Sequence, residues 1–120
     1  MKHAFISLGI IIALIASTVI NSFVLRGIVD TYIERIESAE GGEGAEEFYT
    51  ALYDEFISDE GYISLTVSHE DLRDIEKSFS EVIAAEKMKD ADEAEKAKSR
   101  LIDALLHLKR LCGINIDSIL

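Results

Sequence analysis

The fold is decided by one stretch near the start of the chain. Residues 4–25 read AFISLGIIIALIASTVINSFVL, and none of these 22 positions carries a charge. As a helix this stretch is about 33 Å long, which is enough to cross a hydrocarbon core of about 30 Å. Apolar side chains occur on every side of such a helix, as expected where lipid surrounds it. The stretch therefore predicts a transmembrane helix that contacts the lipid bilayer through residues 4–25.

Three other kinds of segment share this apolar character. A cleaved signal peptide has an apolar run of about 7–15 residues that ends in a small-x-small site, whereas this run is longer and residues 16–18 are a poor cleavage pattern. A type IV pilin-like start needs Gly before Phe and Glu five residues on, but Phe5 follows Ala4, and Gly9 stands where the Glu belongs. A soluble domain of this size could not cover every face of the helix. A membrane anchor is the prediction, and a cleaved, secreted helical protein is an alternative.

The charges that flank the apolar stretch bear on its orientation. Lys2 and His3 stand at one end, whereas Arg26 stands at the other and is followed by Asp30 and Glu34. Lys and Arg near the ends of a span favour the cytoplasmic side. The two sides nearly balance, and we expect a cytoplasmic N-terminus with the remaining chain outside the cell membrane.

The helical pattern continues beyond the apolar stretch. An apolar face with helical spacing extends to about Ala39, opposite charged positions such as Arg26 and Glu34, and residues 41–44 (GGEG) then end it because glycine disfavours helix. We therefore predict three segments: an anchor over 1–25, a helical stalk with a Gly-rich break over 26–44, and an acidic helical bundle over 45–120. The face of the stalk consists of Leu25, Ile28, Val29, Tyr32, Ile33 and Ile36.

Three further amphipathic helices are predicted in the bundle segment. The first covers about fifteen residues from Ala45 to Asp59-Glu60-Gly61, which is predicted to interrupt it, and residues 62–67 are predicted to form a loose helical turn. Its apolar face is predicted to anchor the core and consists of Ala45, Phe48, Tyr49, Leu52, Tyr53, Phe56 and Ile57.

The second and third helices of the bundle have start signals. Ser68 with Asp71 three residues later has the form of a capping box, and Asp90 with Glu93 is a weaker copy. Gly113 is predicted to end the last helix, and the apolar tail 114–120 is predicted to dock across the bundle. The expected fold is all-α: a transmembrane helix that continues into a stalk, then a small antiparallel helical bundle. The expected buried faces consist of Leu72, Ile75, Phe79, Val82 and Ile83, and of Ala94, Ala97, Leu101, Ala104, Leu105, Leu108 and Leu111.

Overall charge excludes one class of partner. The 120 residues include 12 Lys and Arg against 23 Asp and Glu, which gives a formal charge of −11. Nucleic-acid binding needs a basic surface that releases counterions, so no nucleic-acid partner is expected. The single cysteine, Cys112, excludes an internal disulfide. It is expected to be buried beside Leu108 and Leu111 or, alternatively, to form an intermolecular bridge.

Residues that could carry chemistry do not form a recognisable site. The carboxylate pairs at 46–47, 59–60 and 70–71 are sequence neighbours, which point apart on a helix, so we interpret them as solvated surface. His107 and Cys112 lack the spacing of a helical zinc site, and residues 90–93 lack the glycine and distal glutamate of a calcium loop. His3 and His69 stand apart from both. We predict no catalytic, metal or cofactor-binding residue, and no enzyme activity.

Several stretches resemble a known family. The run of residues 68–76, the helix at 101–108 and the closing residues 116–120 are similar to the bacterial domain-of-unknown-function family 4363. Its members have one N-terminal apolar helix followed by an acidic all-helical domain with a short apolar tail. The resemblance implies this plan for most of the chain and implies no activity, ligand or catalytic residue.

The expected function follows from location and architecture. We predict a single-pass, membrane-anchored binding or scaffolding module at the bacterial cell envelope, which contacts an unknown envelope protein. The alternative is a structural membrane protein that self-associates through a coiled coil formed by the stalk face, Leu25–Ile36.

Overall fold

In the computed structural model, which describes the backbone of residues 2–119 and the side chains of residues 2–112, the chain forms four helices. The described residues contain no strand, so the predicted all-α fold is confirmed. The helices are α1 (Lys2–Ser38), α2 (Ala45–Ile63), α3 (His69–Lys87) and α4 (Ala91–Ile119).

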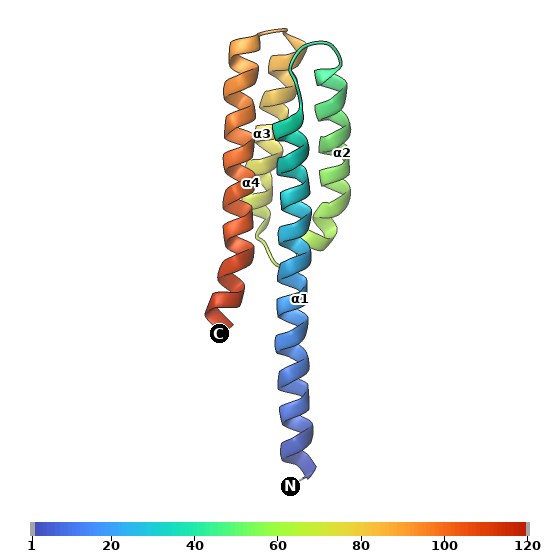
Figure 1. Ribbon diagram of the computed structural model, residues 1–120, viewed down its shortest axis with the longest axis vertical. Coiled ribbons are helices and arrows are strands. Elements are labelled where there is room, and N and C mark those ends of the chain that lie inside the picture. Colours follow the sequence, from blue (N-terminus) through green and yellow to red (C-terminus); the bar gives the residue numbers. More distant parts are fainter. Residues whose placement is uncertain (1, 120) are drawn as a thin grey trace.

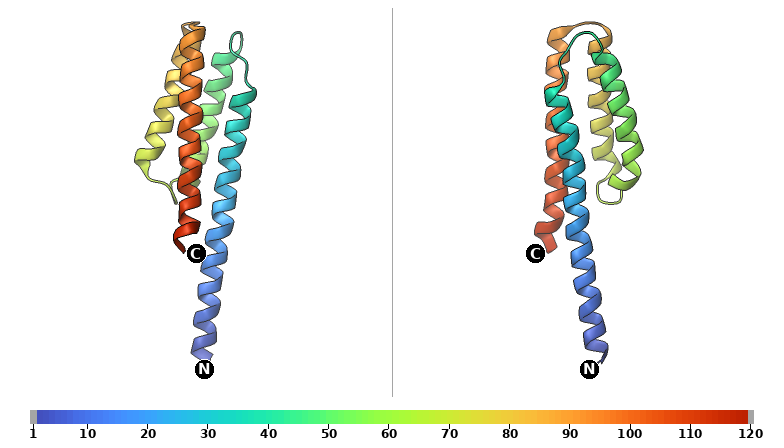
Figure 2. Two further views of the ribbon diagram at one scale, coloured as in Figure 1. Left: turned by 60° about the vertical axis from the view of Figure 1, so that its left-hand side comes forward. Right: turned by 45° about the vertical axis from the view of Figure 1, so that its right-hand side comes forward.

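The helices form an antiparallel bundle from which one end of α1 projects. Figure 1 shows α1 rising from the N-terminus into the bundle, α2 descending, α3 rising and α4 descending beside α1. The N-terminal half of α1 extends beyond the other three helices in every view (Figures 1 and 2). The molecule is consequently elongated, with extents of 68 × 24 × 21 Å. We call the end of the bundle nearer this projection the base and the opposite end the far end.

Helix neighbours follow a simple order around the bundle. The backbones approach most closely between α3 and α4 and between α1 and α4, with α2 beside α3. Aromatic rings fill the space between α1 and α2, because the ring of Tyr32 meets that of Phe56 edge to face with centroids 5.7 Å apart. Phe56 also packs on Phe79 of α3 at 5.5 Å. Such pairs stabilise beyond the apolar area that they bury.

One hydrophobic core joins all four helices. The predicted faces of the last two helices are confirmed, since their apolar residues are buried or partly buried. On the predicted face of α2, Ile57 is the exception, because it is 40% exposed. Core residues fully removed from solvent include Leu25, Ile36, Leu52, Phe56, Phe79, Val82, Ala97, Leu101 and Leu105.

The segment predicted as a stalk is part of this core. Leu25, Val29, Tyr32, Ile33 and Ile36 are buried against the other helices of the same chain. The helix therefore does not stand free above the apolar stretch. The helical spacing predicts the buried face correctly, but the pattern of a single helix does not indicate whether its own chain or a second chain covers that face.

Helix α2 continues past its predicted interruption. Residues 59–61 are helical, and the helix ends at Ile63. Gly61 faces open space, and one glycine costs only about 1 kcal/mol relative to alanine, which tertiary packing can offset. Buried Ile63 and Val67 supply that packing. Residues 64–66 then form turns, as predicted for part of 62–67.

Both predicted helix starts are confirmed. The Ser68 hydroxyl oxygen accepts a hydrogen bond from the Asp71 backbone N–H at 3.3 Å, and the same hydroxyl donates to the Asp71 carboxylate at 2.8 Å. At α4, the Asp90 carboxylate accepts from the Glu93 backbone N–H at 3.1 Å. These bonds satisfy backbone donors that the first turn of a helix leaves free.

The predicted stop at Gly113 is wrong. Helix α4 continues through this glycine to Ile119, because a glycine weakens a helix without requiring it to end. Residue Leu120 and the side chains of residues 113–119 lie outside the described residues, and so does the predicted docking of the apolar tail across the bundle.

Candidate functional site

The most unusual surface of the molecule is the projecting half of α1. Among the described helices, α1 is the one long and apolar enough to cross a membrane. Large apolar side chains on this half face solvent on every side, with Phe5 74% and Leu14 63% exposed. Exposed apolar area of this kind is typical of a surface that contacts a membrane or another protein. The other exposed members are Ile6, Leu8, Ile10, Ile11, Ile12, Ile15 and Ile20.

Where the projection enters the bundle, hydrogen bonds attach it to the turn between α2 and α3. The Asn21 side-chain amide donates to the Thr66 hydroxyl at 3.0 Å. The Tyr62 hydroxyl donates to the Asn21 amide oxygen. The turn is thereby held at the level of α1 where the uninterrupted apolar surface ends.

A second polar contact at this level joins α1 to α4. Among the described residues, Ser22 is the one polar residue that is buried. Its hydroxyl donates a hydrogen bond to the Cys112 backbone carbonyl at 2.8 Å. Cys112 itself is buried, as the first of the two sequence interpretations predicted. Burial raises the pKa of its thiol, although nearby Arg26 acts in the opposite direction. A buried thiol with a raised pKa is a poor nucleophile, so Cys112 acts here as a packing residue.

Potential metal ligands are not gathered in the structure. His3, His69 and His107 are exposed on separate parts of the molecule. His107 lines a hollow of about 260 Å³ between α3 and α4, together with Asp71, Asp74 and Asp103. Within the described side chains, no group of three or more His, Cys, Asp or Glu is arranged to hold a metal ion.

One carboxylate has an environment that the sequence did not reveal. Burial and the neighbouring Glu76 carboxylate of α3 raise the pKa of Glu60 to about 6. The Oε1 atom of Glu60 is buried without a hydrogen-bond partner. The adjacent Asp59 accepts a hydrogen bond from the Tyr32 hydroxyl at 2.5 Å. The interpretation of residues 59–60 as plain solvated surface is therefore wrong, because these carboxylates lie between helices.

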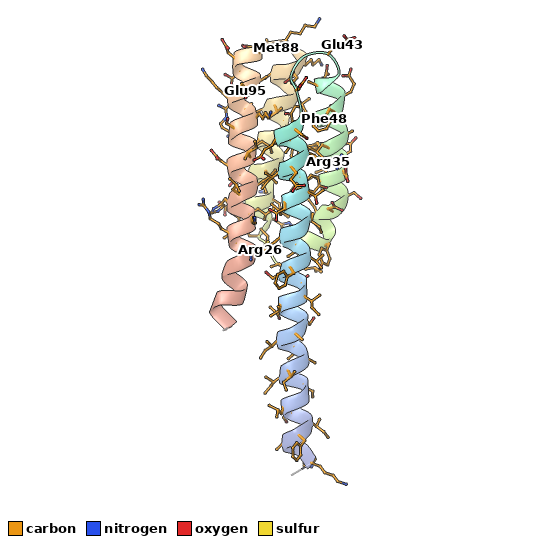
Figure 3. All side chains as sticks on the ribbon, viewed as in Figure 1. Arg26, Arg35, Glu43, Phe48, Met88 and Glu95 are labelled. Carbon is orange, nitrogen blue, oxygen red and sulfur yellow. The ribbon has the colours of Figure 1, made fainter. Side chains whose placement is uncertain are left out.

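A larger hollow lies at the far end of the bundle. It measures about 570 Å³ and is lined by the loop before α2 and by the end of α3, including Glu43, Glu47, Glu86 and Lys89. Figure 3 labels Glu43 and Met88 at this end, opposite the projecting half of α1. The hollow is open and mainly acidic, and none of its charged side chains is buried without a partner. It has the character of a solvated surface between two loops.

The sequence predicts the apolar surface but not the hydrogen bonds that join α1 to the turn between α2 and α3. The uncharged run of residues 4–25 is visible in one window, whereas the contacts of Asn21 with Tyr62 and Thr66 join residues more than forty positions apart. Only the helix-to-helix arrangement brings them together. A signal was present in the sequence, because Asn21 and Ser22 are adjacent polar residues at the end of an apolar run.

Comparison of the chain with models of protein families, with curated proteins and with solved structures finds no match. The resemblance to family 4363 therefore stays a prediction. Any function must be argued from the chain's own surfaces.

Proposed function

We propose that the protein is a single-pass membrane protein in which α1 contacts the lipid bilayer through residues 4–25 and carries the bundle on one side. The observation that carries the proposal is the projection of an uncharged helix whose apolar side chains are exposed all round. Its free energy in water would be unfavourable by about 25 cal/mol for each Å² of apolar surface, and a bilayer removes that surface from water. The core of the bundle is complete without residues 2–20.

Loss of the segment by cleavage is the competing interpretation, because removal of residues 2–20 would leave the buried core intact. The length of the apolar run favours retention of the segment. The two interpretations differ in the mass of the mature chain and in its extraction. We expect an uncleaved chain that stays with the membranes in alkaline carbonate. A shortened chain in the soluble fraction would contradict the proposal.

We further propose that the N-terminus is cytoplasmic and the bundle extracytoplasmic. Lys2 and His3 flank the apolar run with no neighbouring acid, whereas Arg26 has Asp30 one turn away and Glu34 two turns away. The test is a Cys112→Ala chain with a new cysteine at Glu43, a labelled position at the far end of the bundle (Figure 3). A membrane-impermeant maleimide should label this chain in intact cells. Labelling only after lysis would reverse the orientation.

The proposed role of the bundle is binding or scaffolding at the bacterial cell envelope. Residues 37–47, around the loop between α1 and α2, contain five acidic and no basic residues, which suits contact with a partner that presents a basic surface. A coiled coil through the predicted stalk face has less support, because Leu25, Val29 and Ile36 already pack inside their own bundle.

The binding proposal is tested from the far end of the bundle. A photo-crosslinking amino acid at Glu43 should give a crosslink to one defined envelope protein, and reversal of the charges at Glu46 and Glu47 should weaken it. Crosslinks between copies of this chain alone would favour the structural alternative. The matched control places the same amino acid at Ser58, which is exposed on α2 and lies about three turns beyond Glu47.

A further inference from the structure

The two ends of the bundle differ sharply in composition. At the base, residues 61–68 read GYISLTVS and form the longest uncharged stretch beyond residue 25. At the far end, residues 37–47 carry five acids, and the turn of residues 88–90 includes Lys89 and Asp90. In a chain with 29% charged residues, an uncharged turn that faces water is unexpected.

The uncharged turn also exposes apolar side chains. Leu65 is 79% exposed and Tyr62 is 40% exposed. A leucine in this position could be replaced by a polar residue at no cost to the core, since Ile63 and Val67 on either side provide the buried contacts. Its exposure is therefore not explained by folding of the bundle.

Hydrogen bonds hold the turn between α2 and α3 at one position along the axis of α1. Asn21 donates a hydrogen bond to the Thr66 hydroxyl and accepts one from the Tyr62 hydroxyl, and these two bonds hold the turn beside α1. Asn21 lies about 26 Å along the helix axis from Ala4, close to the thickness of a hydrocarbon core of about 30 Å. The turn thus stands where one edge of a bilayer crossed by α1 would be.

Exposed apolar residues of α1 continue the surface at the same height. Ile20, Phe23 and Val24 remain exposed although the neighbouring Ser22 and Leu25 are buried. Together with Tyr62 and Leu65 they form what we call the base patch. Tyr62 has the character of an interfacial residue, because its ring is partly exposed while its hydroxyl is hydrogen-bonded.

We propose that the base patch binds the surface of the lipid bilayer, so that the bundle is seated on the membrane and not held away from it by a stalk. The inference rests on the proposed membrane anchor and deepens it, because it adds a second lipid contact supplied by the turn between α2 and α3. Lipid is the occupant that fits, since the five residues are uncharged and those on α1 continue its apolar half up to the level where Tyr62 bonds to Asn21. The acidic loop lies at the opposite end, away from anionic headgroups.

The test measures the depth of single positions in vesicles. The full chain carrying Cys112→Ala is reconstituted in phosphatidylcholine vesicles with one new cysteine, at Leu65, Met88 or Leu14, labelled with a polarity-sensitive dye. Met88 is the matched control because it is 81% exposed, like Leu65, but lies at the far end. Quenching is compared between lipids brominated near the headgroup, lipids brominated deep in the acyl chain and a water-soluble quencher, because Leu14 lies near the middle of the span of residues 4–25.

The three positions separate the possible outcomes. We expect the dye at Leu65 to lose fluorescence to brominated lipid and to emit at shorter wavelength, while the dye at Met88 responds to the water-soluble quencher alone. A dye at Leu14 that is quenched by lipid while the Leu65 dye behaves like the Met88 dye would overturn this inference and leave the anchor standing. If none of the three dyes is quenched by lipid, the proposed anchor fails as well.

A second variant tests the energetic role of the patch. Leu65→Glu places a charge in the turn without touching the core, and Met88→Glu does the same at the far end. We expect Leu65→Glu, but not Met88→Glu, to increase the exposure of a cysteine at Ser64 to the water-soluble quencher in vesicles. Equal exposure in the two variants would contradict the inference, and unchanged helical circular dichroism establishes that both variants fold.

Discussion

Helix α1 contains two apolar regions that differ in the exposure of their side chains. In the N-terminal region apolar side chains occur all round and stay exposed, as at Leu14. In the C-terminal region one face is apolar, and Leu25 on that face is completely buried. No break in the helix separates them, since α1 continues from Lys2 to Ser38. The difference therefore arises from what surrounds each region and not from local structure.

The comparison shows that the positions of charged residues distinguish a helix that packs in a bundle from a helix that is apolar all round. Beyond residue 25, Arg26, Asp30 and Glu34 lie opposite the apolar face, so only one side of the helix needs cover, and the chain's own helices provide it. Before Asn21 there is no charged side, and the described helices leave most of the large apolar side chains of residues 5–20 exposed. The change occurs over the helical turn of α1 that contains Asn21 and Ser22. The Asn21 side chain bonds to Thr66 between α2 and α3, and the Ser22 hydroxyl bonds to the Cys112 carbonyl of α4.

The largest expected effect comes from an aspartate placed in each region. Ile36→Asp puts an unpaired charge in the core and should unfold the bundle, because such a group costs several kcal/mol. Ile11→Asp should leave the melting temperature in detergent unchanged and reduce the fraction of chain held in membranes. Circular dichroism and membrane fractionation measure the two effects.

The comparison would break if both aspartates behaved alike. A bundle that melts normally with Ile36→Asp would mean that this face is not its core. Full membrane retention with Ile11→Asp would still allow an anchor that tolerates one charge, so Ile11→Asp is combined with Leu14→Asp. Retention of that double variant would argue against lipid contact by this region.

Replacement of one leucine by alanine in each region should have a smaller effect on stability, and the effect should again differ between the two regions. Leu25→Ala removes a fully buried side chain and should lower the free energy of unfolding by about 2–4 kcal/mol. Leu14→Ala, the same change in the exposed region, should alter it by less than about 0.5 kcal/mol. Thermal or denaturant unfolding of the full chain in detergent checks both values. Equal losses would show that the exposed region also packs within the protein.

Much of this fold could be predicted because its signals are local. Helical spacing predicts the buried faces of the described residues except at Ile57, and Ser68 and Asp90 mark two helix starts through bonds to residues three positions away. The predicted ends at Gly61 and Gly113 failed because glycine changes a helix by only about 1 kcal/mol. Packing of Ile63 and Val67 supplies a term of that size, and it is not readable from the glycine itself.

The candidate site was less predictable because it depends on distant residues. The apolar surface itself is one uninterrupted stretch and was found. The contact of Tyr62 with Asn21 and the approach of Glu60 to Glu76 require knowledge of which helices are neighbours. The coverage of the Leu25–Ile36 face required the same knowledge. An amphipathic pattern predicts that a helix face is buried but does not identify the surface that covers it.

Glu60 offers a change in stability that is confined to the bundle. Its folded-state pKa of about 6 exceeds its ordinary value of 4.5, so the folded state favours the protonated form and loses stability as the pH rises from 4.5 to above 6. Glu60→Gln removes this loss. We expect a gain of about 1 kcal/mol at pH 7.5, which allows for solvent screening at a partly exposed group.

The pH dependence identifies the cause. Unfolding of both chains is measured at pH 4 and at pH 7.5, and the advantage of Glu60→Gln should be present at pH 7.5 and almost disappear at pH 4, where glutamate is mainly protonated in both states. Asp54→Asn, at an exposed carboxylate of the same helix, is the matched control. An advantage that persists unchanged at pH 4 would contradict the assignment to titration of Glu60.

Gly61→Ala tests whether α2 truly continues past its predicted interruption. The added Cβ meets no atom within 4 Å, so the substitution should raise the free energy of unfolding by about 0.8 kcal/mol through helix propensity. Gly42→Ala is the opposite control, because the φ of Gly42 is 109° and an alanine there is strained. A loss of stability with Gly61→Ala would place the end of α2 before residue 61.

The smallest expected effect lies at the far end of the bundle, where Lys89 has a φ of 57°. Its N–H bonds to the Glu86 carbonyl at 3.1 Å, and the Asp90 N–H bonds to the Ala85 carbonyl at 3.1 Å, which is the Schellman arrangement that favours glycine at this position. Lys89→Gly should therefore raise the free energy of unfolding by about 0.5 kcal/mol, the strain relieved less the entropy that glycine adds to the unfolded chain. Lys77→Gly, at an exposed position in the middle of α3, should lower it instead. Membrane retention should not change in either variant. The far end of the bundle contacts water both when the exposed region of α1 is in a bilayer and when it is not. A change in retention that follows bundle stability would show that the two regions of α1 are energetically coupled and not independent.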